Sequence, residues 1–252
     1  MDRKRFFDAL RKRDSGVFGT SISQGQVSGT EELLDVAQAR GVPLFHLAYI
    51  LGGVYHETGG MMVPVREGFA KTDIGARRVV AKRSYGKPAG PYNHVYYGRG
   101  RIQNTWLRNM ETLSKRFGHD FVKNPDLLLD PAIDAVVTIV GHQEGLWTGK
   151  KLSDYIGDGR VDYVNARRIV NGTDKAKQIA VYAKAFETAL RAAGYVGQAP
   201  KPSPVPRPSP PVDDPVVTVP PAPKAEKKAS KGPLAIIVGI ILAGIAAWFG
   251  LG

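Results

Sequence analysis

The sequence contains no cysteine, and this absence excludes several classes of protein. Disulfide frameworks, cysteine nucleophiles and zinc sites with thiolate ligands all require that residue. A continuous apolar run near the N-terminus is also missing. The first residues are basic, and an acidic residue and a second basic cluster follow them. We therefore expect no N-terminal signal peptide.

Motifs for nucleic acids, nucleotides and catalytic zinc are lacking as well. We find no helix-turn-helix signature, zinc finger or RNA-binding aromatic motif, and the glycines around Arg99 do not have the spacing of a nucleotide-binding loop. His56 and Glu57 would begin the zinc-binding pattern His-Glu-x-x-His, but position 60 is a glycine. Accordingly we expect no metal, no cofactor and no nucleic-acid partner.

Proline is distributed unevenly and divides the chain into parts. Twelve of the 18 prolines fall between Pro200 and Pro233, so we predict residues 196–232 as an extended, semi-rigid linker. Residues 234–251 are uncharged and would span ~27 Å as a helix. We predict residues 233–252 as a C-terminal transmembrane helix in a lipid bilayer, with a buried core helix as the alternative. The folded domain would then be residues 1–195.

The predicted membrane helix also suggests an orientation and a contact. Four lysines precede it and only Gly252 follows it, so the positive-inside rule places the domain on the cytoplasmic side before lysis. The membrane would be that of the host cell or of a virion. Small residues recur at every fourth position of the helix, which favours self-association: Ala235, Gly239, Ala243 and Ala247.

Apolar residues in the first 195 positions recur every three or four residues, and alternating strand-like runs are few. This pattern predicts an all-α domain. We expect helices beginning near Thr30, running from Pro43 to Thr58, following Pro131, and covering residues 176–193. Residues 60–100 are rich in glycine and aromatic residues without clear periodicity, and such irregular segments often bind ligands.

The domain carries most of the formal net charge of +12. Such a charge favours an anionic partner through long-range attraction. Anionic lipid and the acidic polymers of bacterial walls are both candidate partners. The alternative is a basic surface that simply faces solvent and binds no partner.

Two glutamates are candidates for acid–base chemistry. Glu57 ends a predicted helix, where the helix dipole disfavours a negative charge, and Glu67 lies in the irregular segment beyond a Gly-Gly turn. Glycosidic cleavage by inversion needs two carboxyl groups ~6.5 to 9.5 Å apart. Asp73 is the alternative second carboxylate, and surface glutamates without a role are the simpler interpretation.

Three short motifs are informative because they occur together and in a particular order along the chain. They are His56-Glu57-Thr58-Gly59-Gly60, then Tyr97-Gly98-Arg99-Gly100 with Ile102-Gln103 and Thr105, then Ile169-Val170-Asn171-Gly172. Together they resemble glycoside hydrolase family 19, which contains plant chitinases and many phage endolysins, over roughly residues 40 to 190. The resemblance implies a two-lobed, lysozyme-like, all-helical fold and an inverting mechanism without a cofactor.

The resemblance also implies roles for single residues. Glu57 would be the general acid and Glu67 the base, because phage-type members have an acidic residue near that place. Thr105 would hold the attacking water. The remaining matches are substrate-binding residues that would contact sugars or line the cleft: Gln103, Asn109, Asn171 and Tyr97.

Two positions depart from the family pattern. Arg101 stands where proline is usual, and Val79 stands where plant enzymes have their second glutamate.

From these observations we predict a membrane-anchored, endolysin-like or muramidase-like hydrolase of the β-1,4 glycan backbone of peptidoglycan, with a holin as a partner in host lysis. The same motifs fit a chitinase acting on poly-N-acetylglucosamine. A virion membrane protein that binds the wall and serves entry is an alternative of a different class.

Overall fold

The structure is a computed structural model that describes residues 1–197. Nearly all of the predicted linker and the whole predicted transmembrane helix, with its lysines and its small-residue stripe, lie outside these residues. Among residues 1–197, no helix has both the length and the apolar character needed to cross a membrane.

The described residues are mostly helical, as the apolar periodicity predicts. The α-helices are α1 (Arg3–Leu10), α2 (Gln24–Ala39), α3 (Leu44–Glu57), α4 (Asp73–Val80), α5 (Leu107–Phe117), α6 (Pro131–Glu144) and α7 (Ala176–Ala192). Short 3-10 segments are η1 (Arg13–Ser15), η2 (Glu67–Phe69), η3 (Ser84–Gly86), η4 (Pro125–Leu129), η5 (Leu152–Asp154) and η6 (Asn165–Ile169). Two antiparallel strand pairs join β1 (Val65–Arg66) to β2 (Arg99–Gly100) and β3 (Ile156–Gly157) to β4 (Arg160–Val161).

Helix α2 begins earlier than the sequence predicts. The expected start was near Thr30, but Ser23 caps the helix: its side chain accepts a hydrogen bond from the backbone N–H of Gln26, and the Gln26 side chain accepts one from the backbone N–H of Ser23. This capping box satisfies two backbone donors at the helix start. The first turns are polar and contain glycine, so periodicity alone does not reveal them.

Helix α4 lies inside the segment that was expected to be irregular. Thr72 caps it by accepting a hydrogen bond from the backbone N–H of Gly75. The helix has eight residues and buries only Ala76 and Val80. So short an apolar pattern is not distinctive in a sequence.

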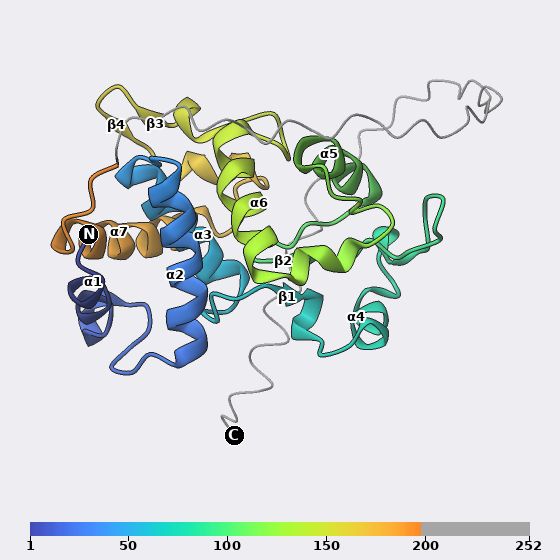
Figure 1. The fold of residues 1–252 in the computed structure, drawn as a ribbon, viewed down its shortest axis with the longest axis horizontal. Helices are drawn as coiled ribbons and strands as arrows, with labels where there is room; N and C mark the ends of the chain where they lie inside the picture. The colour runs from blue at the N-terminus through green and yellow to red at the C-terminus, as the bar shows by residue number, and fades with distance from the viewer. Residues whose placement is uncertain (198–252) are drawn as a thin grey trace. The chain divides into compact units, whose positions relative to one another are not determined.

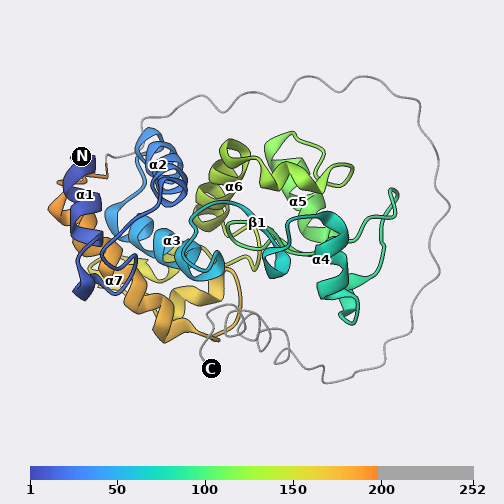
Figure 2. The same ribbon diagram turned by 90° about the horizontal axis from the view of Figure 1, so that it is seen from below.

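Within residues 1–197, the apolar side chains form one large cluster and two small ones. The large cluster unites α1, α2, α3 and α7, and Gly52 of α3 lies so close to Ala183 of α7 that a Cβ atom would be 2.6 Å from the Ala183 nitrogen. One small cluster lies between α5, η4 and α6, and the other lies beneath α4. Figures 1 and 2 show α4 and α5 on one side, the large helical group on the other, and α6 with β1 between them.

Candidate active site

Glu57, the last residue of α3, is buried with 7% of its surface exposed. Its Oε1 atom accepts a hydrogen bond of 2.6 Å from Nη1 of Arg167, which lies in η6 and is also buried. Buried carboxylates are rare unless they are paired. Nothing in the sequence spacing of Arg167 distinguishes it from the other arginines, so no motif predicts its contact with Glu57.

The surroundings of this ion pair include buried aromatic side chains. Tyr49 stacks on Tyr163 and meets His142 edge to face. Burial raises the pKa of the Tyr49 hydroxyl and lowers the pKa of His142 to about 4. Neutral His142 donates a hydrogen bond from Nδ1 to the Thr138 carbonyl at 2.7 Å. His142 is thus satisfied within the core.

Asn171 lies on the turn that follows Arg167. Its backbone N–H donates to the Arg167 carbonyl at 3.0 Å, and its Oδ1 atom accepts from the backbone N–H of Gly172 at 2.8 Å. The Asn-Gly motif therefore belongs to the same turn as the arginine that pairs with Glu57.

Glu67 is the first residue of η2 and is partly exposed. Its Oε1 atom accepts from the Tyr85 hydroxyl at 2.6 Å, and its Oε2 atom accepts from the backbone N–H of Gly98 at 2.8 Å. Burial and the bond to Glu67 both raise the pKa of Tyr85, so this hydroxyl remains a donor. Both carboxylate oxygens are held, which fixes the orientation of Glu67. No sequence motif marks Tyr85 as a partner of Glu67.

Asp73, the alternative second carboxylate, is occupied by other partners. It accepts from the Tyr97 hydroxyl at 2.9 Å and pairs with Arg77 at 2.6 Å. Tyr97 itself is fully buried beneath the Arg99 guanidinium, and burial raises its pKa to about 12. In this structure Tyr97 is thus an interior residue that packs against Arg99 of β2. A direct contact between its ring and a sugar would require Arg99 to move.

Gln103, Thr105 and Asn109 form a connected group. Gln103 donates from Nε2 to the carbonyls of Val65 and Gly100 at 3.1 and 3.0 Å. Thr105 donates its hydroxyl to the Gln103 carbonyl at 2.9 Å, and Asn109 donates from Nδ2 to the Thr105 carbonyl at 2.7 Å. All three are partly exposed.

Gln103 also lies beside the backbone that binds Glu67. A Cβ atom at Gly98 would be 2.8 Å from its Oε1 atom. The structure thus brings Glu67, Gly98, Gln103, Thr105 and Asn109 together, whereas Glu57 and Asn171 belong to the group around Arg167.

The residues 1–197 contain no cluster of three or more side chains suited to hold a metal ion.

Comparisons with known proteins give matches among solved structures only. Models of protein families give no match, and curated proteins give none either. Among solved structures, chitinase C from Streptomyces griseus HUT6037 is 21% identical with a TM-score of 0.48, over 79% of this chain and 78% of that chain. A bacterial family 19 chitinase is 21% identical with a TM-score of 0.47, over 79% of this chain and 97% of that chain.

Proposed function

We propose that this domain is a glycoside hydrolase that cleaves the β-1,4 glycan backbone of peptidoglycan with inversion. The observation that carries the proposal is the buried Glu57–Arg167 ion pair at the end of α3, within a motif that resembles the catalytic motif of glycoside hydrolase family 19. Buried titratable groups with a specific charged partner cluster at active sites.

Glu57 serves as the general acid in this proposal. Protonated Glu57 gives its proton to the leaving glycosidic oxygen as the bond to the anomeric carbon breaks. The carboxylate that results is the form that pairs with Arg167 at 2.6 Å, so the arginine stabilises the product of the proton transfer. Solvent then returns a proton to Glu57 and accepts the proton that the catalytic base has taken up, so both carboxyl groups are restored before the next turnover.

Glu67 serves as the base. The Tyr85 hydroxyl and the Gly98 N–H hold its carboxylate, which takes a proton from the water that attacks the anomeric carbon. Thr105 donates its own hydrogen to the Gln103 carbonyl, which leaves its oxygen free to accept the second hydrogen of that water. Val79 stands where plant enzymes have their second glutamate, and its side chain lies against Gly68, next to Glu67. The Glu67 carboxylate is therefore close to that position, which supports the choice of Glu67 as the base.

The surface beside Glu67 favours an anionic glycan over a neutral one. Residues 71–87 contain six basic residues and one acid, and that acid, Asp73, is paired with Arg77. Lys71, Arg78 and Lys82 are exposed. Peptidoglycan carries carboxylates on its stem peptides, whereas chitin is neutral. A basic surface attracts the former and not the latter.

The proposal includes the membrane anchor at residues 233–252, with self-association through its small residues. The anchor would hold the domain at the host inner membrane or at a virion membrane. In host lysis, a holin would give the cytoplasmic domain access to the wall. The supporting observations are the uncharged run and the lysines that precede it.

The test compares the full-length chain with its Glu57→Gln variant on peptidoglycan and on glycol chitin, by the release of reducing ends. General acid catalysis is typically worth about a hundredfold or more, so we expect Glu57→Gln to lose at least that factor on peptidoglycan. Glu144→Gln removes a surface carboxylate that pairs with Arg116 and should keep full activity. Release from glycol chitin alone would indicate a chitinase, and wall binding without release would indicate a wall-binding virion protein.

A further inference from the structure

Arg101 occupies the position where family 19 sequences usually have proline, and it is completely buried. Its Nη1 atom donates to Oδ2 of Asp134 at 2.9 Å and to the carbonyl of Pro131 at 3.0 Å. Its backbone N–H lies 3.2 Å from each oxygen of the Asp134 carboxylate. Asp134, on the first turn of α6, is equally buried. The arginine is thus bound to the start of α6 by both its backbone and its side chain.

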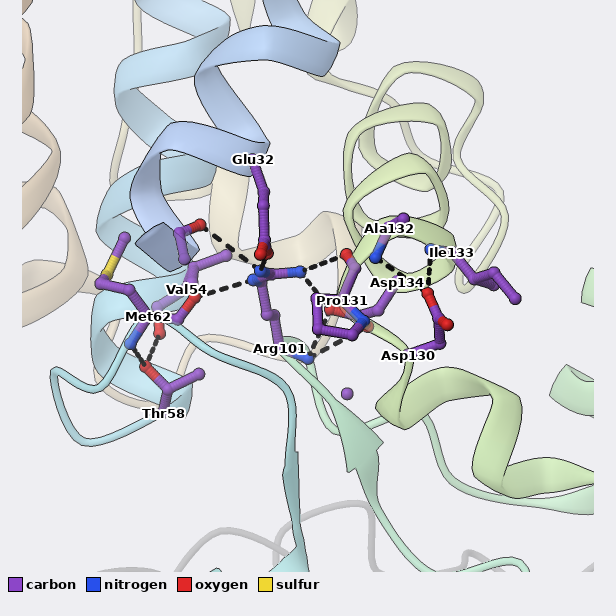
Figure 3. A network of polar contacts seen from close by, with 12 residues as sticks. Glu32, Val54, Thr58, Met62, Arg101, Asp130, Pro131, Ala132, Ile133 and Asp134 are labelled. Carbon is purple, nitrogen blue, oxygen red and sulfur yellow. Dashed lines mark hydrogen bonds and ion pairs between the residues drawn. The ribbon is translucent and has the colours of Figure 1, made fainter. Parts of the chain in front are cut away.

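The other side of the guanidinium reaches two further elements. Nε donates to the Met62 carbonyl at 2.8 Å, and Nη2 binds the Glu32 carboxylate and the Gly29 carbonyl of α2. A guanidinium has five N–H donors, and the contacts of Arg101 provide an acceptor for every one. Figure 3 shows the side chain between Glu32 of α2, Met62 and the start of α6.

Met62 lies midway between the two proposed catalytic carboxylates, five residues after Glu57 and five before Glu67. Its carbonyl is held by Arg101, and its backbone N–H donates to the Thr58 hydroxyl at 3.0 Å. Its φ angle of 63° is a left-handed conformation that a side chain rarely adopts. The backbone N–H and C=O groups of Met62 are thus both hydrogen-bonded, and these two bonds hold the residue in its left-handed conformation.

Two glycines leave room for this arrangement. A Cβ atom at Gly29 would be 2.5 Å from the Met62 carbonyl oxygen, and one at Gly100 would be 2.2 Å from Oδ1 of Asp134. Larger residues at either place would displace Met62 or Asp134. Glycine at positions 29 and 100 therefore permits the contacts that Arg101 makes with Met62 and Asp134.

We infer that Arg101 is a positioning residue, which sets the placement of Glu57 relative to Glu67 by fixing Met62 to α2 and α6. The inference rests on the proposed function. Proline at this position would supply neither the backbone donor nor any side-chain donor, so Asp134 and the Met62 carbonyl would lose their partners. Where proline would contribute only a rigid backbone, Arg101 contributes a buried charged side chain that binds the Met62 carbonyl and Asp134.

The test uses the full-length chain and its Arg101→Lys variant, which keeps the charge but loses the planar set of donors. Amide hydrogen exchange should become at least tenfold faster at residues 58–67 in the variant, with little change in α7. We expect kcat on peptidoglycan to fall at least tenfold, with KM within twofold of wild type. Arg116→Lys, which alters an exposed pair with Glu144, is the matched control and should change neither quantity.

Exchange at residues 58–67 that matches wild type in a folded Arg101→Lys variant would overturn the inference. So would a loss of kcat that only follows the fraction of unfolded protein, since that is a stability effect alone. A third outcome is that wild type releases no reducing ends while the variant still shows the local increase in exchange. The proposed function then fails, and Arg101 holds the segment without a catalytic purpose. That result also overturns its role as a positioning residue. Arg101→Ala provides a second check, because added guanidinium ion should partly restore kcat if the cavity binds it.

Discussion

Arg167 and Glu57 are 110 residues apart in the chain, yet Nη1 of the arginine lies 2.6 Å from Oε1 of the glutamate, and both side chains are buried. The contact brings η6, and with it the turn that follows, to the end of α3. It therefore joins the third sequence motif to the first, and it depends on the close packing of the helices of the large cluster.

Replacing Arg167 with alanine should lower both stability and activity. Breaking a buried ion pair by removing one partner typically costs about 3–5 kcal/mol, because the other charge is left without compensation. We expect a lower unfolding midpoint in urea and a large loss of peptidoglycan cleavage. The matched control is Arg168→Ala, which removes the exposed neighbour and should leave both measurements near wild type. Equal effects of the two variants would show that the Glu57 pair has no special role.

Tyr85→Phe removes one hydroxyl that holds the Glu67 carboxylate. A net hydrogen bond contributes roughly 1 kcal/mol, and one to a charged group somewhat more, so we expect only modest destabilisation. Reorientation of Glu67 should lower kcat, with little change in KM, when initial rates are measured over a range of peptidoglycan concentrations. Tyr92→Phe alters an exposed tyrosine and is the control. An unchanged kcat for Tyr85→Phe would argue against Glu67 as the base.

The sequence predicts those features that depend on neighbouring residues. The helices α3, α6 and α7 follow from apolar periodicity and from end signals such as Pro43 and the Asp130–Pro131 pair, which caps and begins α6. Helix α4 was missed because it buries only two residues. The start of α2 was missed because its first turns are polar.

The candidate site shows the same limit. Glu57 is predicted from its motif and Glu67 from its place beyond the Gly-Gly turn, and both signals are local. Arg167 and Arg101 were not given roles, because their partners come from distant parts of the chain. Tertiary packing decides those contacts, and no pattern of short spacing encodes them. The burial of Tyr97 is a further consequence of packing, because Tyr97 lies in a cluster with Ala76 and Val80 of α4.

His142 should make folding stability depend on pH. Burial lowers its pKa to about 4 in the folded state, below the value of about 6.5 for an exposed histidine. Between these values the unfolded chain binds more protons, so stability is fully present above about pH 6.5 and falls as pH decreases toward 4. At pH 5 the loss is about 2 kcal/mol from this residue. Urea unfolding at pH 7 and pH 5 measures it.

The variant His142→Phe should show a smaller difference between the two pH values than wild type does, even though it loses the bond to the Thr138 carbonyl. His119→Gln, at an exposed position, should keep the wild-type difference. An unchanged pH dependence in His142→Phe would mean that other groups cause the loss of stability at low pH.

The basic surface beside Glu67 should matter for a charged glycan and not for a neutral one. The double variant Arg78→Glu and Lys82→Glu reverses two exposed charges, and we expect it to raise KM on peptidoglycan several-fold at low salt. The effect should shrink as salt is added, because exposed charges are screened over about 10 Å at 0.1 M. Any activity on glycol chitin should remain unchanged. The control, Lys177→Glu with Lys184→Glu on α7, makes the same change of net charge at exposed positions away from Glu67. A similar rise in KM for both pairs would show that net charge alone attracts the wall, whereas a rise confined to the first pair would place the peptidoglycan strand beside α4.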